Sequence, residues 1–217
     1  MTVRLIAITK PVIEECKESS DLIAYCARVS NPANQANTET APRLLRYLAN
    51  NAHWSPFEMA SMTVEITTTR DIARQILRHR SFSFQEFSQR YAEVAAEAVL
   101  REARMQDVKN RQASHDTDDA ELHKRWKEAQ LDVARFCQST YRDAIAHGIA
   151  KEVARSVLPE GLTESTLYMA GTIRSWIHYV QLRTEQGTQK EHRDIARACK
   201  RLLLEQFPSL GDALQAM

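Results

Sequence analysis

Hydrophobic and polar positions alternate in two segments of the first third of the chain. Val3 to Ile8 is an apolar run bounded by Pro11, and Met62, Val64 and Ile66 alternate with polar residues. A period of two places alternate side chains on one face, as in a β-strand with one buried side. We therefore predict strands at about 3–8 and 62–67.

Cap residues and spacing predict helices between these strands, and a loop follows later. Ser20 or Asp21 is a candidate N-cap for a helix that runs towards residue 29, and residues 38–51 form a second helix. Residues 104–119 are polar and have no period, so we expect a mobile loop there.

The second half of the chain is predicted to be mainly helical. Apolar residues recur every three or four positions from residue 122 to Gly148, and a shorter helical segment carries Arg155. Similar spacing predicts helices at 163–183 and 189–206. Because strands come early and helices late, we predict an α+β fold in one domain, with a mixed or antiparallel sheet flanked by helices.

The overall charge does not favour nucleic acid or a membrane as a partner. The chain has 29 lysines and arginines against 28 acidic residues, a formal net charge of +1. No segment approaches the roughly 18 apolar residues of a membrane span. The N-terminal residues lack the apolar core and cleavage site of a signal peptide. Any basic function must therefore be local.

Cysteine and glycine usage excludes several kinds of site. The four cysteines form no CxxC pair and no Cys/His cluster, which argues against zinc or a disulfide framework and indicates a reducing cytoplasm. We predict no metal site. With five glycines, the chain has neither the GxGxxG motif of a Rossmann turn nor a P-loop. Bound phosphates would have to be held by side chains and helix ends.

Residues 78–91, RHRSFSFQEFSQRY, are the strongest candidate for a binding site. A short helix that begins at Thr68 or Thr69 is predicted to end at Arg78, which places Gln75, Arg78 and His79 on one helix face. In an extended segment, the alternating Glu86, Ser88 and Arg90 would point the same way. Arginine binds phosphate, and a carboxylate accepts from a ribose hydroxyl or a base N–H, so this mixture of side chains suits a nucleotide.

Two other interpretations of this segment stay open at this point. A helix that ends in Arg-His-Arg can be a solvated C-terminus whose cations interact with the helix dipole. Aromatic residues beside arginines, such as Phe82 and Phe84, are also typical of RNA-binding surfaces. The near-zero net charge and the absence of an RNA-binding signature argue against RNA.

The pattern Arg78-His79-Arg80, seven residues, then Ser88 resembles the signature of the flavin-dependent thymidylate synthases. Glu86, Arg90 and Tyr91 match the rest of that signature in order. Other blocks resemble the family in the correct order over roughly residues 28 to 191: Ser30, His53 to Glu58, Ala154 to Pro159, Arg174-Ser175, His178 and Leu182-Arg183.

The resemblance implies an α+β fold, a homotetramer with active sites between subunits, and two ligand sites. It implies FAD contacts from Ser30, Ser55, Glu58, Arg78, His79, Arg80, Gln85, Glu86, Thr172, Arg174 and His178. It implies dUMP contacts from Gln75, Arg78, Glu86, Ser88, Gln89, Arg90, Arg155 and Arg183, and a folate channel lined by His53 and Tyr91.

Three positions depart from the family pattern. Gln85 and Thr172 stand where asparagine is common, so the longer Gln85 amide must reach further and a contact from Thr172 is weaker or made by the backbone. Gly187 stands where some members have histidine and is given no side-chain role.

The reaction implied by the resemblance is the reductive methylation of dUMP to dTMP. Methylenetetrahydrofolate would donate the carbon, and FAD reduced by NADPH would donate hydride. No cysteine lies in a motif for covalent activation of uracil, so Arg183 is expected to stabilise negative charge on the ring. The alternative is a relative without turnover that binds nucleotide or RNA.

Overall fold

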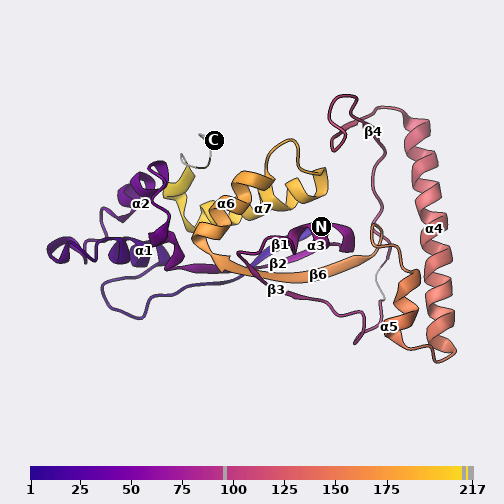
Figure 1. Cartoon of the computed structure of the whole chain (residues 1–217), viewed down its shortest axis with the longest axis horizontal. Helices are drawn as coiled ribbons and strands as arrows, with labels where there is room; N and C mark the ends of the chain where they lie inside the picture. The colour runs from indigo at the N-terminus through magenta and orange to yellow at the C-terminus, as the bar shows by residue number, and fades with distance from the viewer. Residues whose placement is uncertain (95–96, 212–213, 215–217) are drawn as a thin grey trace.

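A four-stranded antiparallel sheet forms the centre of the molecule (Figure 1). The computed structural model describes residues 1–94, 97–211 and 214 of the 217. The strands lie in the order β1-β2-β6-β3. Their bounds are β1 (Thr2–Ile8), β2 (Ser61–Thr69), β3 (Ser83–Glu86) and β6 (Glu164–Thr172).

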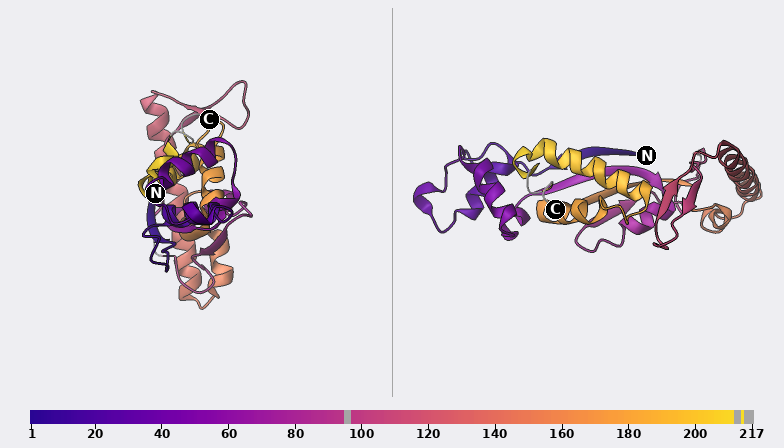
Figure 2. Two further views of the ribbon diagram at one scale, coloured as in Figure 1. Left: turned by 90° about the vertical axis from the view of Figure 1, so that its left-hand side faces the viewer. Right: turned by 90° about the horizontal axis from the view of Figure 1, so that it is seen from above.

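Helices α3, α6 and α7 run along one side of this sheet, while α1 and α2 lie beyond one end of it and α4 stands beyond the other (Figures 1 and 2). The helices are α1 (Ser19–Ala27), α2 (Ala41–Asn50), α3 (Arg70–Ile76), α4 (Ala120–Ala146), α5 (Lys151–Ala154), α6 (Ile173–Arg183) and α7 (Lys190–Gln206). Short 3₁₀ turns are η1 (Pro32–Asn34), η2 (Ser55–Glu58), η3 (Arg155–Val157) and η4 (Pro208–Leu210).

The core lies between the sheet and these helices. Alternate residues of β2, Met62, Val64 and Ile66, are fully buried, as are Leu167 of β6 and Trp176 of α6. The Trp176 indole Nε1 donates to the Met62 carbonyl at 2.9 Å, so the largest core side chain also satisfies its polar atom. The α+β prediction, the strands at 3–8 and 62–67 and the helix at 189–206 are confirmed.

The predicted helix at 163–183 is wrong in its first half. Residues Glu164–Thr172 form strand β6, which pairs with all nine residues of β2, from Ser61 opposite Thr172 to Thr69 opposite Glu164. The alternation of buried Ser165, Leu167 and Met169 is a strand period, which the helical spacing of Leu167 and Ala170 concealed. The helix of this segment, α6, begins only after β6, at Ile173. The Thr172 hydroxyl is its N-cap and accepts from the Ser175 N–H.

Three local boundaries also differ from the predictions. Helix α1 is capped by Glu18 rather than by Ser20 or Asp21, in a capping box with the Asp21 carboxylate. Helix α3 ends at Ile76 instead of residue 78. Extended backbone ends at Glu86, and the Ser88 carbonyl accepts from the next turn, so Glu86, Ser88 and Arg90 do not alternate along one strand.

The segment predicted as an irregular loop at 104–119 contains a small hairpin. Strands β4 (Arg104–Gln106) and β5 (Ser114–Asp116) pair antiparallel, and Asp107 accepts two backbone N–H groups at the turn. Lys190 of α7 forms ion pairs with Glu102 before the hairpin and Asp116 within it. Contacts with a distant helix, which no local pattern encodes, hold this segment.

Glycine is required at position 171 because strand β6 passes directly beside the Phe82 ring. A Cβ on Gly171 would lie 2.4 Å from a Phe82 ring carbon. The Phe82 ring is itself packed edge-on against Trp176, with centroids 4.8 Å apart.

We expect Gly171→Ala to lower the free energy of unfolding by about 1–3 kcal/mol, because overpacking forces the Phe82 ring to shift. Thermal unfolding followed by circular dichroism measures the effect. Gly161→Ala is the control, since a Cβ there meets no atom within 4 Å. Equal midpoints for the two variants would show that the ring moves at no cost.

Candidate active site

The segment that follows α3 contacts the last turn of α6. Helix α3 follows β2 and α6 follows β6, and these strands are antiparallel, so the two helices start at opposite ends of the sheet. Beyond the end of α3, His79 reaches Arg183 in the last turn of α6. The Arg183 Nε donates to the His79 Nε2 at 2.9 Å.

His79 serves Arg183 as a neutral acceptor. Burial, and then the nearby Arg183 charge, lower the pKa of His79 to about 4. Because Nε2 accepts, the ring proton lies on Nδ1. Within the described part of the chain, the two terminal nitrogens of Arg183 make no hydrogen bond or ion pair, so they are available to a ligand.

A second histidine lies behind this pair. His192 of α7 is fully buried, with its Nε2 3.2 Å from the Tyr179 hydroxyl and its Nδ1 3.3 Å from the Gln75 Oε1. Burial is also the main reason that the pKa of His192 is lowered to about 3 and that of Tyr179 is raised. The His79 ring packs edge-on against Tyr179 at a centroid distance of 4.9 Å. Gln75, His79 and Arg183, three of the predicted residues, are therefore brought together.

A second group lies near the start of α6. Arg174 forms an ion pair with Glu58, and the ring of His178 lies 4.9 Å from Trp54, edge-on. Burial, and then the charge of Arg174, lower the pKa of His178. The Ser175 hydroxyl donates to the Ser81 carbonyl at 3.2 Å, which ties α6 to the segment after Arg80.

Arg78 and Arg80 fit the binding of a dinucleotide cofactor. Both side chains are exposed and form no ion pair or hydrogen bond with the residues that the structure describes. Two such guanidinium groups, separated by a single residue, are suitable donors for a pyrophosphate. The Thr172 hydroxyl accepts from the Ser175 N–H as the N-cap of α6, so this side chain is already engaged within the chain.

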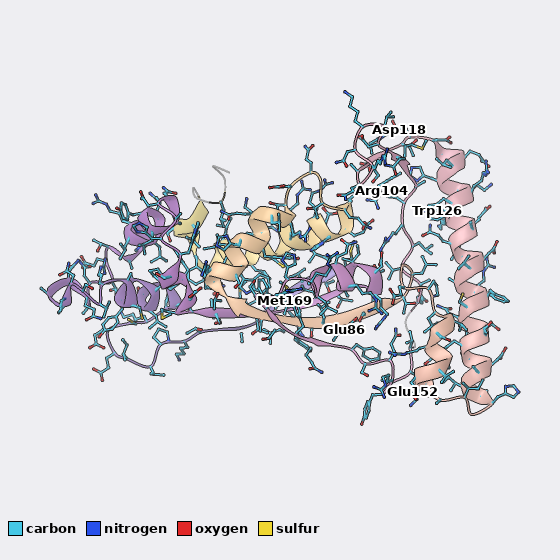
Figure 3. The ribbon with its side chains drawn as sticks, viewed as in Figure 1. Glu86, Arg104, Asp118, Trp126, Glu152 and Met169 are labelled. Carbon is cyan, nitrogen blue, oxygen red and sulfur yellow. The ribbon has the colours of Figure 1, made fainter. Side chains whose placement is uncertain are left out.

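Glu86 is held by two residues that sequence reasoning missed. The Ser165 hydroxyl donates to Glu86 Oε1 at 2.8 Å, and Arg70 lies 3.4 Å from the same oxygen. Glu86 is the last residue of β3, and Figure 3 shows it apart from Glu152, which lies on α5. The missed signal for Arg70 was its place at the first turn after a predicted strand; Ser165 could not be found without the β2–β6 register.

A fourth group surrounds Glu152. Arg90 forms an ion pair with the Glu152 carboxylate at 3.1 Å, and the Arg155 Nε donates to the Glu152 carbonyl at 3.3 Å. Gln89, nearby in the chain, is 3% exposed, and its Nε2 has no acceptor among the described residues. Two cations and a buried donor are thus concentrated near the C-terminal half of the candidate segment.

Several predicted residues do not join any of these groups. Ser30, His53, Ser55, Gln85, Ser88 and Tyr91 are exposed, and their side chains make no hydrogen bond within the described ranges. His53 contacts Tyr47 edge-on at 6.0 Å. No side-chain hydrogen bond or ion pair within residues 1–94, 97–211 and 214 joins the groups around Arg183, Arg174, Glu86 and Glu152.

Comparisons with known proteins identify the family. Residues 11–209 match the sequence model of the family described as thymidylate synthase complementing protein. The chain belongs to this family. Its resemblance to flavin-dependent thymidylate synthases, inferred from the Arg-His-Arg signature, is confirmed.

Family relatives match along the whole chain. A probable flavin-dependent thymidylate synthase of Paramecium bursaria Chlorella virus 1 is 51% identical over 99% of both chains. A flavin-dependent thymidylate synthase of Synechocystis sp. is 52% identical over 99% of this chain and 100% of the relative. The crystal structure of the UMP/dUMP methylase PolB from Streptomyces cacaoi, bound with 5-Br dUMP, is 30% identical, with a TM-score of 0.82, and covers 100% of this chain and 95% of that chain.

The described residues contain neither a membrane-spanning helix nor a cluster of metal ligands. None of their helices is long and apolar enough to cross a membrane. They also contain no group of three or more His, Cys, Asp or Glu side chains that could hold a metal ion.

The neutral buried histidines predict a pH dependence of stability. Below pH 6.5 the unfolded chain takes up protons at His79 and His192, but the folded chain does not until its pKa values of about 4 and about 3. The free energy of unfolding therefore decreases as the pH is lowered through this window, by up to about 1.4 kcal/mol per pH unit for each histidine.

We expect His192→Gln to have a shallower fall than the wild type between pH 6.5 and pH 4, measured by urea unfolding. The exposed His147, changed to glutamine, should keep the wild-type slope. Identical slopes for wild type and His192→Gln would mean that His192 protonates equally in both states.

Proposed function

We propose that this chain is a flavin-dependent thymidylate synthase that converts dUMP to dTMP, with methylenetetrahydrofolate as the carbon donor and NADPH as the reductant. The observation that carries the proposal is the geometry of Arg183. Its Nε is fixed by neutral His79, and no described residue pairs with its terminal nitrogens. Family membership and the names of the relatives support the same activity.

Arg183 is proposed to bind the O2 and N3 edge of uracil. Its positive charge stabilises the negative charge that develops on the ring when C5 acts as a nucleophile. Covalent activation by a thiolate has little support, because burial raises the pKa of Cys199 to about 12 and also raises the pKa of Cys16. Cys26 and Cys137 lie outside the groups described above.

The remaining nucleotide contacts are proposed from the other groups. Arg90 and Arg155, which meet at Glu152, would bind the phosphate together with Ser88. Gln75 and Glu86 would bind neutral groups of the nucleotide, and Arg78 and Gln89 complete the proposed set.

FAD is proposed to bind along Arg78, His79 and Arg80 and the start of α6. There the residues fit, since Arg78 and Arg80 are exposed and their guanidinium groups, which have no partner among the described residues, can bind the pyrophosphate. The other proposed contacts are Ser30, Ser55, Glu58, Gln85, Glu86, Thr172, Arg174 and His178, with His53 and Tyr91 beside the folate. When bound and reduced by NADPH, the flavin supplies the hydride that completes the methyl group.

We also propose that the protein assembles as a homotetramer with shared sites. The residues of α4 buried within the chain are Gln130, Ala134 and Tyr141, whereas Phe136 is 75% exposed and Val133 49% exposed. An amphipathic helix buries its apolar stripe, yet the described chain leaves Phe136 largely exposed and Val133 half-exposed, on the helix where Trp126 is labelled in Figure 3. A second copy is the proposed cover, and it would bring together groups that one chain keeps apart.

The catalytic assignment predicts a selective loss of activity. Arg183→Ala should lower dTMP formation by about 10²- to 10³-fold, since a charge-stabilising donor contributes roughly 2.7–4 kcal/mol. Release of tritium from C5 of labelled dUMP measures the reaction, with labelled UMP tested in parallel because PolB is described as a UMP/dUMP methylase. NADPH-driven flavin reduction should stay measurable.

Arg201→Ala, at an exposed position of α7, is the matched control and should retain wild-type turnover. Full activity of Arg183→Ala would remove Arg183 from the mechanism. Wild-type protein that binds neither FAD nor dUMP would contradict the proposed function itself.

The assembly predicts that a charge on the α4 stripe dissociates the oligomer. Wild-type protein should have four times the 24.8 kDa mass of the chain in light scattering. Phe136→Asp should give smaller species, because burying an unpaired carboxylate is costly. Val12→Asp, at a residue that is 99% exposed, is the control. A monomeric wild type, or an intact Phe136→Asp oligomer, would contradict this arrangement.

A further inference from the structure

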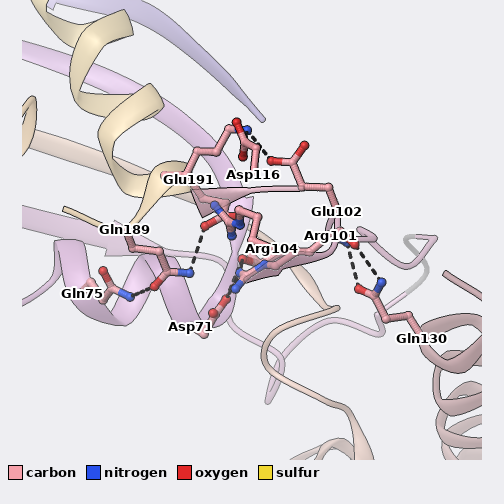
Figure 4. A network of polar contacts seen from close by, with 11 residues as sticks. Asp71, Gln75, Arg101, Glu102, Arg104, Asp116, Gln130, Gln189 and Glu191 are labelled. Atoms are coloured by element: carbon pink, nitrogen blue, oxygen red, sulfur yellow. Dashed lines mark hydrogen bonds and ion pairs between the residues drawn. The ribbon is translucent and has the colours of Figure 1, made fainter. Parts of the chain in front are cut away.

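A line of polar side chains connects the β4–β5 hairpin to Gln75 of α3, one of the proposed nucleotide contacts. Arg104 of β4 forms an ion pair with the Glu191 carboxylate, which also accepts from the Gln189 Nε2 at 2.9 Å. The Gln189 Oε1 accepts from the Gln75 Nε2 at 2.7 Å. Figure 4 shows these four side chains in sequence from the hairpin to α3.

The charge on Glu191 gives this line a direction. An ionised carboxylate only accepts hydrogen bonds, so Gln189 must present its NH₂ group to Glu191 and its oxygen to Gln75. Gln75 must then present its NH₂ group to Gln189. The Gln75 Oε1 therefore faces His192 and lies 3.3 Å from its Nδ1.

The same constraint fixes the tautomer of His192. An amide oxygen facing Nδ1 requires the proton on Nδ1, so Nε2 must accept from the Tyr179 hydroxyl at 3.2 Å. Tyr179 packs against His79, which holds Arg183. The orientation of each member therefore follows from one carboxylate, which is 8% exposed as a residue.

We propose that Glu191 is a positioning residue for the nucleotide site: through Gln189, it fixes which atoms of the Gln75 amide are presented to the substrate. Gln189 uses one N–H of the Gln75 amide and His192 uses one lone pair of its oxygen, so one N–H and one lone pair remain for a ligand. If the amide were reversed, the positions of this donor and this acceptor would be exchanged. This proposal rests on the proposed function, in which Gln75 contacts dUMP.

A purely structural role is the competing explanation, since Arg104 and Glu191 also hold the hairpin against α7. The ion pair of Lys190 with Glu102 holds the same hairpin without joining the line to Gln75. Glu102→Gln is therefore a matched control: it removes a contact of the hairpin and leaves the amide orientations unchanged.

The kinetic test uses the isosteric Glu191→Gln variant, whose amide can donate as well as accept. We expect the KM for dUMP to rise about tenfold, the effect of one lost hydrogen bond. We expect kcat to change less than about twofold, as for a lost binding interaction, and flavin reduction by NADPH to be unchanged. Equal changes in Glu191→Gln and Glu102→Gln, or a fall in kcat at unchanged KM, would overturn the proposal.

A second test does not depend on turnover. The chain has seven histidines, and ¹⁵N–¹H correlations of histidine-labelled protein report the tautomer of each ring. His192, assigned by the loss of its signal in His192→Gln, should be the Nδ1–H tautomer in the wild type and a mixture in Glu191→Gln. An Nε2–H tautomer in the wild type, or no change in the variant, would overturn the proposal even if the enzyme makes dTMP. The expected tautomers in a protein without activity would instead locate the failure in the proposed function.

Discussion

The antiparallel pairing of β2 with β6 is the constraint on which the candidate site depends. Nine paired residues give strands of roughly 30 Å, and each strand continues into a helix that folds back over the same side of the sheet. Helix α3, with seven residues, is roughly 10 Å long, and α6, with eleven, is roughly 16 Å long. Two helices that start at opposite ends and together nearly span the strand bring the segment after α3 close to the last turn of α6. That is where Arg183 reaches His79.

The chemistry at this point follows from burial. A protonated histidine beside Arg183 would place two positive charges together in a poorly solvated position, so the lowered pKa of His79 and its role as an acceptor have the same cause. The interaction fixes the guanidinium through Nε and removes no charge from it. Arg183 can therefore present an undiminished positive charge to a ligand.

Elements defined by a local period were predictable from the sequence, and those defined by distant contacts were not. The alternation of Met62, Val64 and Ile66 identified β2, whereas β6 was assigned to a helix because its buried alternation becomes clear only when it pairs with β2. Helical spacing with Gln75 and Arg78 indicates His79, and the family resemblance adds Arg183, but their contact could be known only from the strand register. Gln189 and Glu191 belong to no motif. His192 had one signal, its position on the apolar stripe of α7, and such a histidine is often only a core residue.

The arrangement of charge along the polar line explains how it can be buried. Ionised groups occur only at its two ends: the Arg104–Glu191 pair beside the hairpin, and Arg183 at the site. The intervening amides, imidazole and phenol are neutral, so they cost less to desolvate than a chain of ion pairs would. Neutral amides, however, can be reversed without loss of hydrogen bonds unless one neighbour accepts only. An ionised carboxylate at the outer end supplies that restriction, which is why Glu191, and not an interior residue, determines the orientation of Gln75.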